Sequence, residues 1–234
     1  MGESATSGVN RAIPRYFLQI GILTLVYAVT LFVPAGRLDW RMAWIFVAIV
    51  AASQIGVALI LMVNNPALLG ERAESKGPRD LDRVLAGIMA LFGPASTCLV
   101  AGLNLRLGWL PQMPSALEFA GIALAVLGSL VTAWAMASNK FFYGVLRIAQ
   151  EKNHLVCASG PYQYVRHPGY LGAILFDLGT PLMLGSAWAL IPAAFTVCAI
   201  VVRTRLEDET LQNELAGYRD YARRVRQRLL PGIW

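Results

Sequence analysis

Four apolar runs constrain the fold of this chain more than any other feature. They cover approximately residues 14–33, 42–63, 84–103 and 117–137. A helix of roughly 20 apolar residues crosses the hydrocarbon core of a bilayer. Every backbone polar group in lipid must be hydrogen-bonded, and an open sheet would leave unpaired edges. We therefore predict an all-α fold, a polytopic integral membrane helical bundle.

Composition supports the same class and excludes others. Only 15% of the residues are charged, whereas about one quarter is usual in soluble domains. Three cysteines, Cys98, Cys157 and Cys198, form no CxxC pair, so neither a disulfide framework nor a zinc site is expected. Two histidines are too few for a metal site.

The apolar stretch at residues 170–202 is too long for one ordinary span. It is either one long kinked helix or a hairpin of two short helices, because Pro181 and Pro192 interrupt it. Arg and Lys favour cytoplasmic loops, and only Arg37, Arg41 and Arg106 lie outside the N-terminus, the even-numbered loops and the tail. The basic tail joins the other cytoplasmic segments only if the stretch crosses twice. We therefore prefer the hairpin, which gives five to six hydrophobic segments with both termini and the active site cytoplasmic.

After Arg203 the sequence predicts one amphipathic helix that continues the last span out of the membrane. Its apolar positions recur at helical spacing with charges between them; they are Leu206, Leu211, Leu215, Tyr218, Tyr221 and Val225. We expect a single membrane domain over residues 1–234, with transmembrane helices in 1–138 and a ligand-binding core in 139–234.

The segment GPYQYVRHPGYLG, residues 160–172, concentrates aromatic and basic side chains just before an apolar run. Gly160-Pro161 indicates a turn, and His167-Pro168 indicates a helix start. Unpaired N–H groups at a helix start can hold an anion. The alternative is that these residues are ordinary interface anchors.

Two further pairs are candidate site residues. Arg203 and Glu207 are four apart on one helix face; they form either a surface ion pair or a site for an anionic substrate and a cationic ligand. Gln150 and His154 precede the motif and are either site residues or ordinary loop polarity. Phosphate-cradling glycine loops and GxSxG are absent. The net charge of +6 fits membrane lipids better than nucleic acid.

The order of the GPYQYVRHPGYLG motif, an apolar hairpin and R…ED..L…Y..Y resembles the isoprenylcysteine carboxyl methyltransferase family. The phospholipid N-methyltransferases are similar more loosely. The resemblance is specific over residues 141–234, and the whole chain resembles bacterial-type members. It implies that S-adenosylmethionine is bound on the cytosolic side and leaves as S-adenosylhomocysteine.

The resemblance also implies residue roles. Implied cofactor-binding residues are Gln150, His154, Leu155, Val156, Tyr162, His167, Pro168, Tyr170 and Glu207. Arg203 is implied to meet the substrate carboxylate and, with His167, to be catalytic. Asp208 stands where the family has a second glutamate, and Leu215-Ala216-Gly217 is one residue shorter than the family pattern.

The chemistry agrees with these roles. Aromatic faces hold a sulfonium by cation–π attraction, and a carboxylate acceptor is already ionised at neutral pH. An amine acceptor would want a base, for which His167 is the candidate. We expect a lipophilic or prenylated acceptor, with a carboxylate favoured. Alternatives are a phospholipid or amine N-methyltransferase, an NADPH-dependent sterol-reductase-like enzyme and a membrane scaffold; the oligomeric state is left open.

Overall fold

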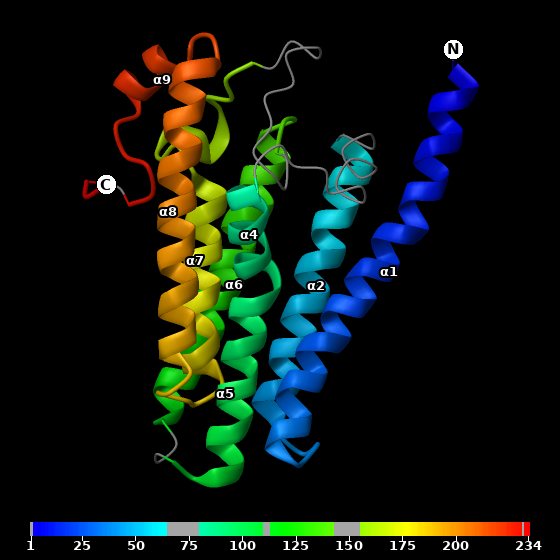
Figure 1. Ribbon diagram of the computed structural model, residues 1–234, viewed down its shortest axis with the longest axis vertical. Helices are drawn as coiled ribbons and strands as arrows, with labels where there is room; N and C mark the ends of the chain where they lie inside the picture. Colours follow the sequence, from blue (N-terminus) through cyan, green and yellow to red (C-terminus); the bar gives the residue numbers. More distant parts are fainter. Residues whose placement is uncertain (1, 65–79, 110–112, 143–154, 231) are drawn as a thin grey trace.

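The computed structural model describes residues 2–64, 80–109, 113–142, 155–230 and 232–234. Within these ranges every regular element is helical, which confirms the all-α prediction. Figure 1 shows the long helices side by side in one bundle. The elements are α1 (Gly2–Ala35), α2 (Arg41–Asn64), α4 (Asp80–Gly87), the π-turn η1 (Ile88–Phe92), α5 (Gly93–Leu107), α6 (Ser115–Ser138), the 3-10 turn η3 (Gly160–Gln163), α7 (Pro168–Met183), α8 (Leu190–Glu214) and α9 (Tyr218–Arg224).

Four helical segments of the described chain are long and apolar enough to cross a membrane. They are Ile13–Ala35, Arg41–Asn64, Leu81–Leu107 and Ser115–Ser138. The first, second and fourth agree with the predicted spans to within a few residues. The third begins earlier than predicted, because residues 80–83, which we assigned to a loop or its border, are the first turn of α4. The chain is an integral membrane protein.

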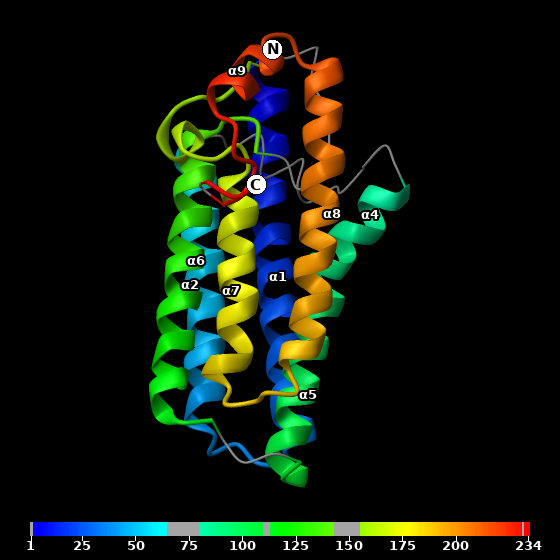
Figure 2. The ribbon, with the colours of Figure 1, turned by 90° about the vertical axis from the view of Figure 1, so that its left-hand side faces the viewer.

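The third span is not a uniform α-helix, and Pro94 explains why. A proline has no N–H and cannot bond the carbonyl four residues earlier, which here is that of Ala90. Tyr27 of α1 donates its hydroxyl to this carbonyl at 2.5 Å. The π-turn η1 lies at this point and separates α4 from α5, which Figure 2 shows as a bend between the two helices.

The long stretch after Tyr170 forms the predicted hairpin. α7 descends, the chain turns over residues 184–189, and α8 returns beside it (Figure 2). Gly185 adopts a left-handed φ of 68° in the turn, and Ser186 donates its N–H to the carbonyl of Pro181 at 3.0 Å. The end of α8 therefore lies at the same end of the bundle as the start of α7.

Glycines allow α6 and α7 to pack closely. A Cβ on Gly128 would collide with the backbone of Gly172, and a Cβ on Gly121 would collide with the backbone of α7 near Gly179. Small residues let transmembrane helices approach one another in this way. This contact fixes the start of α7 against the end of α6.

The prediction of one continuous amphipathic tail helix was wrong. α8 ends at Glu214, and Gly217 adopts a left-handed φ of 80° before α9 begins. Leu215, Tyr218 and Tyr221 pack with Tyr162 in one buried cluster. The predicted apolar face therefore belongs to a broken helix that folds back over the bundle end, where its aromatic residues are buried.

Candidate active site

A cavity of about 270 Å³ lies at the end of the bundle where α7 begins. Its walls come from the end of α6, the GPYQYVRHPGYLG segment, α7, α8 and α9, with Met89 added from η1. Its lining consists of Met89, Thr132, Asn139, Phe141, Phe142, Leu155, Val156, Cys157, Tyr162, Arg166, His167, Gly169, Tyr170, Ala173, Arg203, Glu207, Leu211, Leu215, Tyr218 and Tyr221.

The GPYQYVRHPGYLG segment forms the turn and the helix start that the sequence predicts. Gly160 has a left-handed φ of 58° and rests against the end of α6, where a Cβ would collide with Ser138. Pro168 begins α7, and His167 precedes it with extended φ. His167 accepts the N–H of Tyr170 on its carbonyl at 3.1 Å. The two aromatic rings therefore stack at the helix start, with centroids 5.9 Å apart.

Asp208 organises the cations on the far side of this wall. Its carboxylate is fully buried and accepts two parallel bonds from Arg166, at 2.8 and 2.9 Å. Arg228 donates to it at 2.9 Å and Tyr218 at 3.0 Å. The His167 Nε2 lies 3.3 Å away. Burial alone would raise the pKa of Asp208, but the bonds from His167, Arg166 and Arg228 hold it well below its usual range.

Glu207 faces the cavity rather than this cluster. One of its oxygens accepts the Tyr170 hydroxyl at 2.5 Å, and the other lies 3.9 Å from Nδ1 of His167. Its side chain is 24% exposed, whereas that of Asp208 is 0% exposed. The two adjacent acids of α8 thus have different surroundings: Asp208 is paired with buried cations, and Glu207 presents negative charge to the cavity.

Arg203 also reaches the cavity, one helical turn before Glu207. Its guanidinium lies over the Tyr170 ring, 5.8 Å from the centroid. The predicted surface ion pair with Glu207 is not what the described residues show. Arg203 is buried and pairs instead with Asp82 of α4, with Nε 3.0 Å from Oδ1.

The cavity gathers most of the residues that the resemblance singled out. Seven of them line it: Leu155, Val156, Tyr162, His167, Tyr170, Arg203 and Glu207. Pro168 is buried at the start of α7 beside it. Gln150 and His154 lie outside the described residues. The roles assigned to all of these residues remain predictions.

Several lining residues were not predicted as site residues. Tyr218 and Tyr221 were predicted only as apolar positions of the amphipathic tail helix, yet they line the cavity. Tyr221 donates its hydroxyl to the carbonyl of Tyr162 at 2.7 Å. Asn139 donates to the Tyr162 hydroxyl at 3.3 Å. Burial raises the pKa of Tyr162 above its usual range, so its phenol stays neutral. Tyr218 and Tyr221 reach the cavity because the helix is broken between α8 and α9, which the sequence pattern did not predict.

The fold and the cavity together define a polytopic helical membrane protein with a ligand site at one bundle end. Among the described residues there is no group of three His, Cys, Asp or Glu side chains that could hold a metal ion. A polar, aromatic cavity with a buried arginine and a ligand-facing carboxylate suits an organic cation and an anionic group. The cavity is therefore a candidate small-molecule site.

Comparison with known proteins agrees with this class. The model of the isoprenylcysteine carboxyl methyltransferase (ICMT) family matches residues 121–213. The solved structure of the eukaryotic intramembrane Ras methyltransferase is similar in fold, with a TM-score of 0.56 and 16% sequence identity, covering 87% of this chain and 72% of that one. The chain is therefore similar over residues 121–213 to the isoprenylcysteine carboxyl methyltransferase family, a family whose methyl donor is S-adenosylmethionine.

Individual relatives match over different lengths. Protein-S-isoprenylcysteine O-methyltransferase B of Arabidopsis thaliana is 28% identical over 108 residues, which is 45% of this chain and 55% of the relative. Protein-S-isoprenylcysteine O-methyltransferase of Rattus norvegicus is 24% identical over 224 residues, which is 91% of this chain and 74% of the relative. The chain thus spans about half the length of the Arabidopsis relative.

Proposed function

We propose that this protein transfers a methyl group from S-adenosylmethionine to the carboxylate of a lipophilic, isoprenylcysteine-type acceptor. The observation that carries the proposal is the placement of Glu207 and Arg203 on one cavity wall, one helical turn apart, with Tyr170 between them. One group presents negative charge and the other positive charge to the same space. A cationic donor and an anionic acceptor need this pair of environments.

The cofactor would lie against Glu207, His167, Tyr162 and Tyr170. Glu207 has an oxygen available for a cationic or hydroxyl group, because only the other accepts from Tyr170. The aromatic faces suit the sulfonium, which attracts the negative face of an aromatic ring. Leu155 and Val156 add apolar side chains to the cavity wall. S-adenosylmethionine supplies an electrophilic methyl group when it is bound there.

The acceptor carboxylate would meet Arg203. An arginine presents parallel N–H donors that match a carboxylate, and the Arg203 guanidinium is held in place by Asp82 and Tyr170. The carboxylate is already ionised at neutral pH, so attack needs no base. The protein's contribution is alignment of the two groups and exclusion of water from them. The Nε2 of His167 contacts Asp208 and Tyr218, and these contacts position His167 on this wall.

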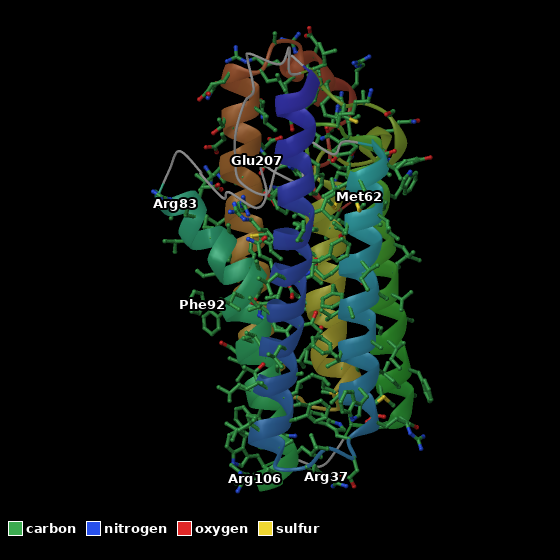
Figure 3. The ribbon with its side chains drawn as sticks, turned by 90° about the vertical axis from the view of Figure 1, so that its right-hand side faces the viewer. Arg37, Met62, Arg83, Phe92, Arg106 and Glu207 are labelled. Atoms are coloured by element: carbon green, nitrogen blue, oxygen red, sulfur yellow. The ribbon has the colours of Figure 1, made fainter. Side chains whose placement is uncertain are left out.

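We further propose that the cavity faces the cytoplasm, as do both termini. Among the Lys and Arg residues that the structure describes, Arg37, Arg41 and Arg106 lie at the bundle end opposite the cavity. Figure 3 shows Arg37 and Arg106 at one end and Arg83 and Glu207 toward the other. The positive-inside rule then places the cavity end in the cytoplasm. We also propose that the protein is a bacterial-type member of the family and lies in the inner membrane. Its ligand-binding core would start at residue 139, and Met89 and Thr132 from the amino-terminal part would complete the cavity wall.

Two measurements test the proposal. Isothermal titration in detergent should give heat with S-adenosylhomocysteine and none with NADPH; the reverse pattern would favour a sterol-reductase-like enzyme. Methyl transfer from labelled S-adenosylmethionine is then measured on farnesylcysteine, phosphatidylethanolamine and fatty acids. A base-labile ester on farnesylcysteine supports carboxyl methylation. A product on the amine lipid alone would instead identify an N-methyltransferase.

A further inference from the structure

A second depression, of about 410 Å³, lies outside the cavity, between the end of α8, α9 and the chain end. Its lining holds five arginines, Arg166, Arg219, Arg223, Arg226 and Arg228, and no acidic residue. The cofactor cavity and this depression share Arg166. The proposed methyl transfer uses none of the other four arginines, so their concentration here needs its own explanation.

The charge of this depression is only partly offset. One buried carboxylate, Asp208, serves both Arg166 and Arg228. Arg219 bonds neutral oxygens, the Gln212 carbonyl at 2.7 Å and the Asn213 amide at 3.1 Å. These contacts fix the orientation of three guanidinium groups and leave a positive excess.

The other two arginines lie at the exposed rim. Arg223 pairs with Asp220 at 3.3 Å, but both side chains are more than three-quarters exposed, and such pairs contribute little. Arg226 is exposed beside them. Arg166 also donates to the carbonyls of Val225 and Arg226, at 2.8 and 2.7 Å. An anion that enters the depression therefore meets the oriented guanidinium groups of Arg219 and Arg228 at its base and two exposed arginines at its rim.

The depression sits at the membrane border. Arg166 and His167 donate their N–H groups to the carbonyls of Gln227 and Arg228, both at 2.9 Å. The same segment rests, at Gly160, on Ser138, which ends a candidate span. Figures 1 and 2 place the C-terminus level with the start of α7. The base of the depression thus lies at the bundle end where the candidate span of α6 ends.

Apolar side chains follow the arginines directly. Leu230 is 45% exposed and Ile233 is 79% exposed. A closed turn holds them outward, because the N–H groups of Leu229 and Leu230 both donate to the carbonyl of Trp234, at 2.9 and 3.1 Å. Arg228 stacks on the Trp234 ring, 5.1 Å from its centroid. Apolar tips beside fixed cations match a molecule with a charged head and an acyl chain.

We propose that this depression binds the phosphate headgroup of an anionic phospholipid, with Leu230 and Ile233 against its acyl chain. The site is separate from the cofactor cavity but linked to it, since Arg228 and Arg166 bond Asp208 and Asp208 bonds Tyr218 and His167 of the cavity wall. The proposal does not depend on methyl transfer, and lipid binding can be measured without it.

The test compares lipid binding to the full-length protein in detergent by native mass spectrometry. Phosphatidylglycerol and phosphatidylcholine of the same chain length are titrated separately. The wild type should prefer phosphatidylglycerol by about 25-fold or more, because each of the two rim arginines contributes about a 5-fold gain near a lipid phosphate. Arg223→Gln with Arg226→Gln should reduce the preference by about 25-fold and leave S-adenosylhomocysteine binding intact.

A matched control removes the same charge from the same end. Arg205→Gln with Arg224→Gln alters two exposed arginines that do not line the depression, and it should keep the preference. Equal loss in both double variants would show non-specific attraction and overturn the site. A wild type without preference would also overturn it. Displacement of phosphatidylglycerol by excess inorganic phosphate alone would identify free phosphate, not lipid, as the occupant.

Discussion

Arg203 and Asp82, 121 residues apart, form a buried ion pair that ties α8 to α4 beside the cavity. Their side chains are 7% and 8% exposed, and Arg203 Nε lies 3.0 Å from Asp82 Oδ1. The pair fixes the cation that would meet the acceptor, yet Asp82 does not line the cavity. Acceptor binding and cofactor binding should therefore respond differently to its loss.

Asp82→Asn should destabilise the protein and weaken use of the acceptor. Breaking a buried ion pair by removing one partner costs about 3 kcal/mol. The KM for the acceptor should rise. The affinity for S-adenosylhomocysteine should stay within about 2-fold of the wild-type value, which is a change in binding free energy of well under about 1.4 kcal/mol. Thermal unfolding and titration calorimetry check both points. If Asp82→Asn lowered the cofactor affinity as much as a Glu207 variant does, the separate roles of Asp82 in acceptor binding and Glu207 in cofactor binding would be contradicted.

Glu207→Gln should weaken cofactor binding directly. Glu207 carries the only carboxylate among the described residues that line the cavity, and hydrogen bonds to a charged group contribute about 1.5–3 kcal/mol. We expect the S-adenosylhomocysteine Kd to rise about 10- to 100-fold. Glu209→Gln is the matched control, because Glu209 is exposed and pairs with Arg205; its Kd should not change.

Asp208 should make stability depend on pH in the acid range. Its folded pKa lies below its unfolded value, so the stabilisation is present above the unfolded pKa of about 3.9 and is lost as pH falls below it. The difference in unfolding temperature between wild type and Asp208→Asn should be constant from neutral pH down to about 5. It should shrink at lower pH, and a difference that grew on acidification would refute the assignment.

Gly128→Ala should loosen the bundle, since a Cβ there would collide with Gly172 and Phe176 of α7. Overpacking of this kind typically costs about 1–3 kcal/mol. Gly56→Ala is the control, because nothing lies within 4 Å of a Cβ at that position. Thermal unfolding in one detergent should separate the two variants; equal unfolding temperatures would show that the close α6–α7 contact is not needed.

Hydrophobicity and charge predicted the fold well for physical reasons. A long apolar run in a lipid bilayer must form a spanning helix, so the length of each run was enough to predict the spans. The hairpin followed from the basic tail, whose arginines must return to the side of the other basic loops. The broken tail helix did not follow, because Leu215 and Gly217 interrupt a pattern that still reads as one amphipathic helix.

The site was predicted in part. Seven of the predicted site residues, among them His167, Arg203 and Glu207, line one cavity. Their partners were missed, because long-range pairs leave no local pattern. Asp82 and Arg203 lie on different helices, and Asp208 gathers Arg166 and Arg228 from segments that only the fold brings together.

The central claim is that the cavity holds the methyl donor and the acceptor together on the wall of Glu207 and Arg203. An experimental density map with S-adenosylhomocysteine and farnesylcysteine tests it most directly. We expect cofactor density against Tyr162, Tyr170 and Glu207, with the acceptor carboxylate at Arg203. Cofactor density elsewhere, or an empty cavity at saturating ligand, would contradict it.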